Sequence, residues 1–342
     1  MRAVVKRRTS TLFLLIGICL AALLAPGLRP SVATPVLLVV NQRDRNVSII
    51  DPIAAREIAT VPEGETMGHG HEIAVSPDGR TAYLPIYSDV GLGQPGIDGH
   101  EMLVIDIRAR KVTGRVEFNH PVRPHCPVYD RVSGLLYVTT ELDNSVAIVD
   151  PRSLKVVGTI PTGQPQSHML TISHDGRRGY TSNASPSTVS VLDMSTRKVE
   201  AIIPDTGQAQ RVAISNDDTM VFVPDQTKPR LAIIDTSTNK IKTWLALPSP
   251  GYATTPTLDG RWLLVALKTA NKLAVVDLET QQVVRTIDVP AGPQEIVMRP
   301  DGKVAYVSCI RVDKVVVVDL ATWTVQAIVT AGNGADGVAW VP

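Results

Sequence analysis

Three histidines in the first half of the chain stand at equivalent points of a repeated pattern. His71 lies in GHGHEIAVSPDG, His125 in HCPVYD and His168 in QSHMLTISHDG. Each stands at the start of an apolar segment that runs into a turn. Imidazoles that converge from separate strands bind borderline divalent ions such as zinc, copper or iron. The three positions therefore suggest a metal or polar-ligand site, provided that the fold brings them together.

A repeat of about 42 residues makes these positions comparable. An apolar strand that ends in Asp recurs as NVSIID, EMLVID, SVAIVD, TVSVLD, RLAIID, KLAVVD and KVVVVD. Four short strands per unit, with turn signals every 8–12 residues, are typical of a β-propeller blade. The chain starts with a second strand, PVLLVVNQ, and ends with a first strand, DGVAWVP. We therefore predict one all-β domain over residues 34–342, a seven-bladed propeller of four-stranded antiparallel blades whose C-terminal strand completes the N-terminal blade.

First strands line the channel of a propeller, so the residues aligned with the histidines should form a ring at one mouth. A second set of side chains ends the second strands on the same face, and two of its members, Glu141 and Asp225, are acids where two other blades have Asn. We predict metal ligands among His71, His125, His168, Glu141, Asn183 and Asp225, with Zn, Cu, Fe or Ca as candidate ions. Proton carriers would be His71 or Glu141. The predicted ligand-binding residues are Tyr87, Asp98, His100, Gln210, Tyr252 and Asp336.

One connection is longer than the others and falls on this face. Blade two carries an insertion at about residues 88–100, within YSDVGLGQPGIDGHEM. A Gly-rich loop at the mouth of a propeller is expected to act as a lid. The repeated strand-end Asp residues and the Asp-Gly turns are predicted to be architectural, because an Asp there caps its own turn. Cys126 and Cys309 would lie in non-adjacent blades, too far apart for a disulfide.

The first 33 residues have the layout of a secretory signal peptide. Arg2, Lys6, Arg7 and Arg8 precede the apolar run TLFLLIGICLAALLA, and a small-residue cleavage signature follows. We predict a secreted or periplasmic protein, exported by a Sec-type rather than a twin-arginine signal, with no membrane segment after cleavage. The remaining chain has 29 Lys and Arg against 33 Asp and Glu. This mildly acidic, aromatic-poor composition argues against nucleic-acid binding, and we expect a monomer.

Two stretches resemble a known family. YVTTELDNSVAIVDPRSLKVVGTIPTGQP and GYTSNASPSTVSVLDMSTRKV are similar to the YVTN repeat of secreted, YncE-like seven-bladed propellers. The resemblance covers residues 35–342 and implies the fold. It does not choose a function, because such propellers serve as binding scaffolds, redox-partner domains and lactonase-like enzymes. The lactonase-like members hold a divalent ion at this mouth with Glu, Asn and Asp, which implies that role for Glu141, Asn183 and Asp225.

Three functions stay open at this point. The first is a binding module that takes a small molecule, a metal ion or a protein partner at the channel mouth. The second is a metal-dependent hydrolase or lactonase, in which the ion polarises a carbonyl and activates water. The third is a redox accessory propeller, for which covalent haem is excluded by the lack of a CxxCH motif.

Overall fold

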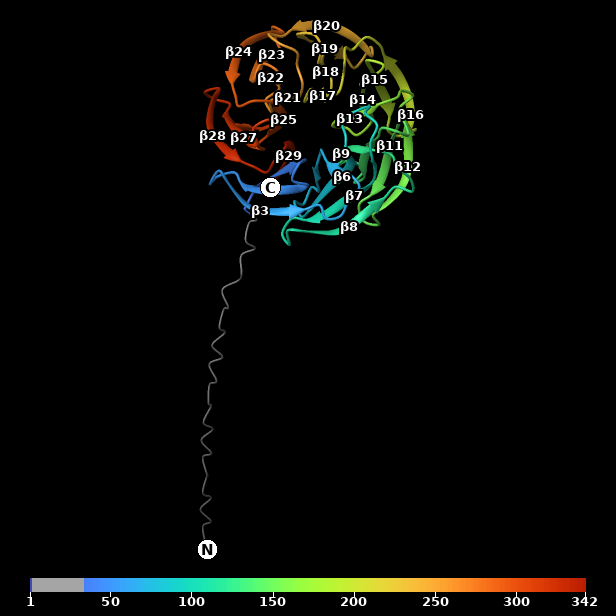
Figure 1. Cartoon of the computed structure of the whole chain (residues 1–342), viewed down its shortest axis with the longest axis vertical. Coiled ribbons are helices and arrows are strands. Elements are labelled where there is room, and N and C mark those ends of the chain that lie inside the picture. Colours follow the sequence, from blue (N-terminus) through green and yellow to red (C-terminus); the bar gives the residue numbers. More distant parts are fainter. Residues whose placement is uncertain (2–33) are drawn as a thin grey trace. The chain divides into compact units, whose positions relative to one another are not determined.

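Seven antiparallel sheets stand around a central axis in the computed structural model, which describes Met1 and residues 34–342 (Figure 1). Six sheets have four strands, and in the second blade the innermost strand is split into two short pieces. This confirms the predicted seven-bladed β-propeller. The predicted signal peptide lies outside the described residues.

The strands follow one another from the inside of each blade to the outside. Blade one consists of β29 (Ala335–Val341), β1 (Val36–Asn41), β2 (Asn46–Asp51) and β3 (Arg56–Pro62). Blade two consists of β4 (His69–Gly70) and β5 (Ala74–Val75) on the inside, then β6 (Thr81–Ser88), β7 (Asp98–Asp106) and β8 (Lys111–Glu117). Blade three consists of β9 (Pro124–Tyr129), β10 (Leu136–Thr140), β11 (Ser145–Asp150) and β12 (Lys155–Pro161). Blade four consists of β13 (Ser167–Ile172), β14 (Arg178–Asn183), β15 (Thr188–Asp193) and β16 (Lys198–Ile203).

The last three blades keep the same order. Blade five consists of β17 (Ala213–Ile214), β18 (Met220–Pro224), β19 (Arg230–Asp235) and β20 (Lys240–Ala246). Blade six consists of β21 (Thr254–Pro256), β22 (Trp262–Leu267), β23 (Lys272–Asp277) and β24 (Gln282–Asp288). Blade seven consists of β25 (Pro293–Met298), β26 (Val304–Cys309), β27 (Lys314–Asp319) and β28 (Thr324–Thr330).

The propeller closes by pairing the two ends of the repeat. Strand β29 lies antiparallel to β1, with Leu37 opposite Trp340 and Leu38 opposite Ala339. The first blade is thereby completed by the last strand of the chain, as predicted from the sequence. Closure of this kind pairs the edge that an open β1 would leave bare.

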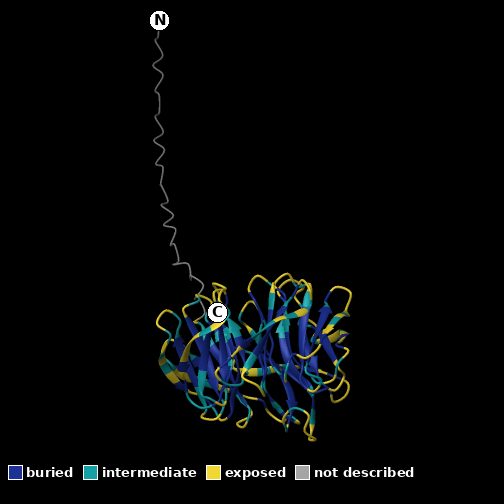
Figure 2. Ribbon diagram, turned by 90° about the horizontal axis from the view of Figure 1, so that it is seen from above, coloured by how far each residue is buried: buried dark blue, intermediate teal, exposed yellow. Residues whose placement is uncertain are grey.

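The burial pattern explains why the middle strands are continuous apolar runs. In β19, Leu231, Ala232, Ile233 and Ile234 are all fully buried, because both faces of a middle strand pack against neighbouring blades. Outer strands such as β28 instead alternate between exposed and less exposed residues. In Figure 2 the dark blue, buried residues lie within the blades and the yellow, exposed residues lie mainly on the loops. The described residues contain no helix long and apolar enough to cross a membrane.

The repeated strand-end aspartates cap their own turns. Asp51 accepts hydrogen bonds from the backbone nitrogens of Ile53 and Ala54, both at 2.9 Å. The other six blades repeat this bond from an Asp carboxylate to the backbone two or three residues later, at Asp106, Asp150, Asp193, Asp235, Asp277 and Asp319. Their architectural role is confirmed, so they are not candidates for the site.

Candidate ligand-binding site at the channel mouth

The seven residues predicted to surround the channel mouth, here called the mouth ring, largely contact one another in chain order. The rings of His125 and His168 stack with centroids 3.7 Å apart, and those of His71 and His125 lie 5.4 Å apart. The ring continues through Asp336, whose carboxylate lies 3.7 Å from Nδ1 of His71. On the far side, Gln294 donates a hydrogen bond of 3.2 Å to the Tyr252 hydroxyl. The mouth ring consists of His71, His125, His168, Gln210, Tyr252, Gln294 and Asp336.

Most of the mouth ring carries buried polar atoms that no protein group satisfies. Five of its seven residues have such an atom within the described structure: Nε2 of His71, Nδ1 of His125, Nδ1 of His168, Oε1 of Gln294 and Oδ1 of Asp336. Buried polar groups in folded proteins nearly always have a partner, which is another protein group, an ordered water or a ligand. Two of these atoms, Nδ1 of His168 and Oδ1 of Asp336, lie 3.8 and 3.7 Å from the charged groups of Glu141 and Arg211, and none of the five has a hydrogen-bond partner in the protein. The ring is therefore a place where ordered water or a ligand would complete the hydrogen bonding.

Burial keeps the three imidazoles of the mouth ring neutral. It lowers the pKa of His71 and of His125 well below the ordinary value, and the positive charge of Arg211 lowers both further. Burial also lowers the pKa of His168, although the carboxylate of Glu141 acts in the opposite direction. At neutral pH each ring therefore has one nitrogen that donates and one that accepts.

Glu141 and Tyr87 support the histidines from the neighbouring strands. The Tyr87 hydroxyl donates to Oε2 of Glu141, and Nδ1 of His168 lies 3.8 Å from the same oxygen. Burial alone would raise the pKa of Glu141, but nearby His168, the hydrogen bond from Tyr87 and the charge of Arg123 hold it below its ordinary value. The Tyr87 ring lies 4.9 Å from that of His71. Two predicted site residues, Glu141 and Tyr87, are thus in contact with the mouth ring.

The insertion of blade two reaches from its own blade to blade four. Residues 89–97 connect β6 to β7, so the loop is shorter than the predicted range because both flanking strands are extended. Arg123 holds the loop through Asp98, at 2.5 Å, and through the carbonyl of Gln94, at 2.6 Å. At its tip, the Cβ position of Gly93 lies 3.0 Å from the amide nitrogen of Gln166 in blade four. Asp98 therefore positions the loop, which is a different role from the predicted contact with a ligand.

Three other predicted residues are bonded within their own blades. The amide of Asn183 bonds with Ser167, at 2.7 Å, and with hydroxyls on β15. Asp225 caps its own turn and accepts a hydrogen bond of 3.0 Å from Nε of Arg230. His100 is partly exposed and lies 4.0 Å from Glu117 on the adjacent strand. These contacts do not support a place for Asn183, Asp225 or His100 beside the three histidines.

The floor of the mouth is a buried charge cluster that sequence reasoning missed. Arg211, in blade five, reaches across the channel to Glu72 of blade two, at 2.6 Å, and to Glu295 of blade seven. Asp336 of blade one lies 3.7 Å from the same guanidinium. Burial raises the pKa of each of these three carboxyls. Because Arg211 spans the channel, the mouth has a charged floor beneath the ring.

A signal for this cluster was present in the sequence. Glu72, Arg211 and Glu295 each follow a mouth-ring residue directly, at a position where other blades have Cys126, Met169, Ala253 and Gly337. Charged residues inside an apolar first strand are unusual unless they are paired. Reading one position further along the aligned repeat would have found them.

Neither remaining cysteine shows reactive features. Cys126 and Cys309 are both free and buried, and burial raises the pKa of each thiol to about 12. Cys126 donates weakly to the carbonyl of Leu170, at 3.6 Å. The prediction that they do not form a disulfide with each other is confirmed.

The arrangement does not fit a preformed metal site. Within the described part of the chain, no group of three or more His, Cys, Asp or Glu side chains is placed to hold a metal ion. His125 and His168 stack face to face, whereas metal ligands must direct their nitrogens at one point. An ion at the three histidines would need at least one of these rings to rotate. The metal ligands named from the sequence therefore stay a prediction.

Glu63, close to His69 at the entrance, gives a first testable result. Its Oε1 accepts a hydrogen bond of 3.1 Å from the backbone nitrogen of Gly70, and burial raises its pKa from 4.5 to about 7. Between those values the folded protein holds a proton that the unfolded chain has released, so stability falls as pH rises. The full fall is about 3 kcal/mol. Replacing Glu63 with Gln should remove it, as measured by urea unfolding at about pH 5 and pH 8. If the free energy of unfolding changed equally between the two pH values in both proteins, this assignment would be contradicted.

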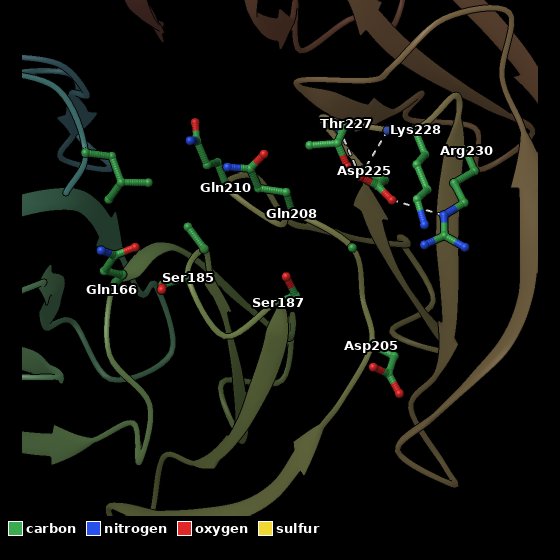
Figure 3. Close-up of a pocket in the computed structure, with 13 residues that line it drawn as sticks. Gln166, Ser185, Ser187, Asp205, Gln208, Gln210, Asp225, Thr227, Lys228 and Arg230 are labelled. Carbon is green, nitrogen blue, oxygen red and sulfur yellow. Dashed lines mark hydrogen bonds and ion pairs between the residues drawn. The ribbon is translucent and has the colours of Figure 1, made fainter. Parts of the chain in front are cut away.

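A pocket of about 620 Å³, here called the blade 4–5 pocket, lies beside the mouth ring and shares Gln210 with it (Figure 3). Leu92 of the insertion lines it together with Gln166 of blade four. The other walls come from the loops around Ser185 and Gln208 and from Lys228 and Arg230 of blade five.

Comparison with solved structures places the fold among propellers of varied chemistry. The chain is similar to the periplasmic gluconolactonase PpgL of Pseudomonas aeruginosa, with 16% identity and a TM-score of 0.72, over 90% of this chain and 99% of that one. It is also similar to the hydrazine synthase of Kuenenia stuttgartiensis, with 18% identity and a TM-score of 0.68, over 80% and 89%. A third likeness is to the dihydro-heme d1 dehydrogenase NirN in complex with DHE, with 17% identity and a TM-score of 0.65, over 89% and 74%.

Sequence comparison supports one family. No curated protein matches this sequence significantly. Residues 245–341 match the family described as YNCE-like beta-propeller. Together with the seven blades described above, this match over the C-terminal part of the chain supports a YncE-like seven-bladed β-propeller.

Proposed function

We propose that the protein is an exported binding propeller that takes a small polar ligand in the mouth ring, beneath the insertion of blade two. The five unpaired buried polar atoms of the ring carry this proposal. Neutral imidazoles and an amide would exchange hydrogen bonds with a ligand that offers both donors and acceptors. The charged floor at Arg211 limits the depth to which such a ligand enters.

A metal-dependent hydrolase is the second candidate. The observation that favours it is the set of three neutral imidazoles, since the neutral form is the one that binds a metal ion. Ionised Glu141 beside His168 would then serve as a base. Likeness of fold to a gluconolactonase is compatible with this candidate but does not select it, because unrelated chemistries share the propeller fold.

Calorimetric titration tests the first candidate. The untagged mature protein is titrated with Zn²⁺, Cu²⁺ and a panel of hexoses, sugar lactones and esters. We expect at least one compound to bind with a stoichiometry of one. In the His125→Ala/His168→Ala double variant its affinity should fall tenfold or more, because several buried hydrogen bonds are lost.

A second double variant provides a matched control. His120 and His174 are exposed and pair with Asp143 and Asp218, away from the mouth ring. His120→Ala/His174→Ala also removes two histidines and should bind as the wild type does. Equal binding by all three proteins, or no binding by any, would contradict the proposal.

The same samples separate the two candidates. A hydrolase would bind about one metal ion per chain and would turn over a lactone or ester, with activity lost in Glu141→Gln. Substoichiometric metal that does not fall further in the His125→Ala/His168→Ala variant would rule out the metalloenzyme and leave the binding module.

A further inference from the structure

Arg230, in the blade 4–5 pocket, is held in one orientation by two contacts. Its Nε donates to Oδ2 of Asp225 at 3.0 Å, and its guanidinium lies over the Trp244 ring at 3.7 Å from the centroid. The side chain is 33% exposed, so it is neither buried in the core nor free in solvent. An arginine that is fixed at Nε and stacked on an aromatic ring loses little further freedom when it binds.

The terminal nitrogens of Arg230 remain available. In the part of the chain that the structure describes, neither Nη atom of Arg230 has a hydrogen-bond partner. Blades six and seven show what normally occupies this position at the start of the third strand. There Lys272 pairs with Asp288 on the adjacent strand, and Lys314 bonds with Thr330 at 2.8 Å.

Blade five has no such acceptor on the adjacent strand. The residue opposite Arg230 is Ala246. The guanidinium therefore keeps its two Nη groups for something outside the protein, in the planar pair that matches an oxyanion.

Asp225 leaves the Nη groups of Arg230 available for an anion, because both of its carboxylate oxygens already accept other hydrogen bonds. Its Oδ1 accepts from the hydroxyl and backbone of Thr227 and from the backbone of Lys228, while Oδ2 accepts from Arg230. Lys228 lines the same wall and adds a second cation. The other acid, Asp205, lies on a separate part of the pocket, apart from Lys228 and Arg230 (Figure 3).

The remaining walls suit hydroxyl groups. Gln166, Gln208 and Gln210 offer amides and Ser185 and Ser187 offer hydroxyls, whereas Leu92 and Ala184 are apolar. Both donors and acceptors are present, as a polyol requires. A volume of about 620 Å³ is within the range of small-molecule sites and holds a monosaccharide with room to spare.

We infer that the blade 4–5 pocket binds a small hydroxylated oxyanion, such as a sugar carboxylate or a sugar phosphate, with the anionic group at Arg230 and Lys228. The site goes beyond the ligand proposed for the mouth ring, with which it shares Gln210. The two sites have different critical residues, so either proposal can fail without the other.

Three probes of one sugar test the inference. Glucose, glucuronate and glucose 6-phosphate are titrated separately into the mature protein by calorimetry. At least one of the two anions should bind at least tenfold more tightly than glucose, and comparison of the two anions distinguishes a carboxylate from a phosphate. In Arg230→Gln the affinity for the preferred anion should fall tenfold or more. In Lys228→Gln, a change at an exposed position, that affinity should fall threefold or more.

The controls separate loss of the site from loss of the fold. Lys272→Gln removes a cation at the equivalent position of blade six and should bind as the wild type does, as should His120→Ala/His174→Ala, which changes neither the pocket nor the mouth ring. Lys228→Gln keeps Asp225 and Arg230 paired, so it also tests the site if Arg230→Gln is unstable. Equal binding of glucose and both anions would overturn the inference, and so would unchanged affinity in Arg230→Gln and Lys228→Gln. The inference would also fail if neither anion bound at about 10 mM, which corresponds to a binding free energy weaker than about −3 kcal/mol.

Discussion

Replacing Arg211 with methionine should lower the free energy of unfolding by about 3–5 kcal/mol, because removing one member of a buried ionic group leaves its partners uncompensated. Arg211 is the cation that faces Glu72, Glu295 and Asp336 in the channel. Methionine fills much of the same volume, so the expected loss is electrostatic. Urea unfolding at neutral pH measures it.

The pH dependence of this variant identifies the cause. Without Arg211, the pKa values of the three buried carboxyls should rise further, since burial already raises them. The folded variant then holds protons that the unfolded chain has released, so it should regain stability relative to the wild type as pH falls.

A partly exposed arginine serves as the control. Arg178 forms a two-pronged ion pair with Glu200, its Nη1 also donates to the carbonyl of Thr236 at 2.7 Å, and its side chain is 37% exposed. Arg178→Met should cost about 1 kcal/mol or less, as exposed ion pairs do. Losses of equal size in Arg178→Met and Arg211→Met would contradict the importance of the channel cluster.

Gly99→Ala should have the second large effect, with an expected loss of about 3 kcal/mol or more in the free energy of unfolding, by overpacking against atoms that cannot move aside. A Cβ at Gly99 would lie 1.7 Å from the carbonyl oxygen of Ile86. The Gly99 carbonyl also accepts hydrogen bonds of 3.0 Å from the backbone nitrogens of Val122 and Arg123. Displacement there should loosen Arg123 and with it the insertion, so amide hydrogen exchange should rise across residues 89–97.

The same loop contains its control. A Cβ at Gly91 would meet no atom within 4 Å. Gly91→Ala should therefore leave both stability and hydrogen exchange close to those of the wild type. Similar behaviour of Gly91→Ala and Gly99→Ala would mean that the base of the insertion does not depend on this close approach.

The repeat is the reason that so much of the fold was predictable. Each blade repeats the same strand and turn signals, so alignment of the repeats predicts the number of blades, the closing strand β29 and the positions of the mouth ring. Alignment gives the position of a residue along a strand. It does not give the partner of its side chain.

That limit explains why the partners of Asp225 could not be predicted and why Arg211 was missed. Asp225 stood out because it is an acid where two other blades have Asn, but in the structure it pairs with Arg230 five residues later, much as Asn183 bonds with Thr188. At this pair of positions blade four has Asn and Thr, whereas blade five has Asp and Arg. Arg211 was missed for the converse reason, since its partners lie across the channel in blades two and seven.

The histidine pair at the entrance shows the same distinction. His69 and His71 flank Gly70, and their rings stack 4.8 Å apart. Only His71 occupies a mouth-ring position, where it contacts His125 and Asp336. His69 lies beside the ring, so its part in binding is expected to be secondary.

Nitrogen-15 NMR of the imidazoles tests the central claim most directly, because it reports the protonation and bonding of each ring nitrogen. The mature protein, labelled at histidine, is titrated with acid and then with the tightest compound from the calorimetric panel. We predict that His71 and His125 titrate well below the ordinary histidine value, since burial lowers the pKa of both, and that mouth-ring nitrogens shift on binding while those of His120 and His174 do not. Titration of His71 and His125 near pH 6.5, with no change on adding the compound, would contradict the account.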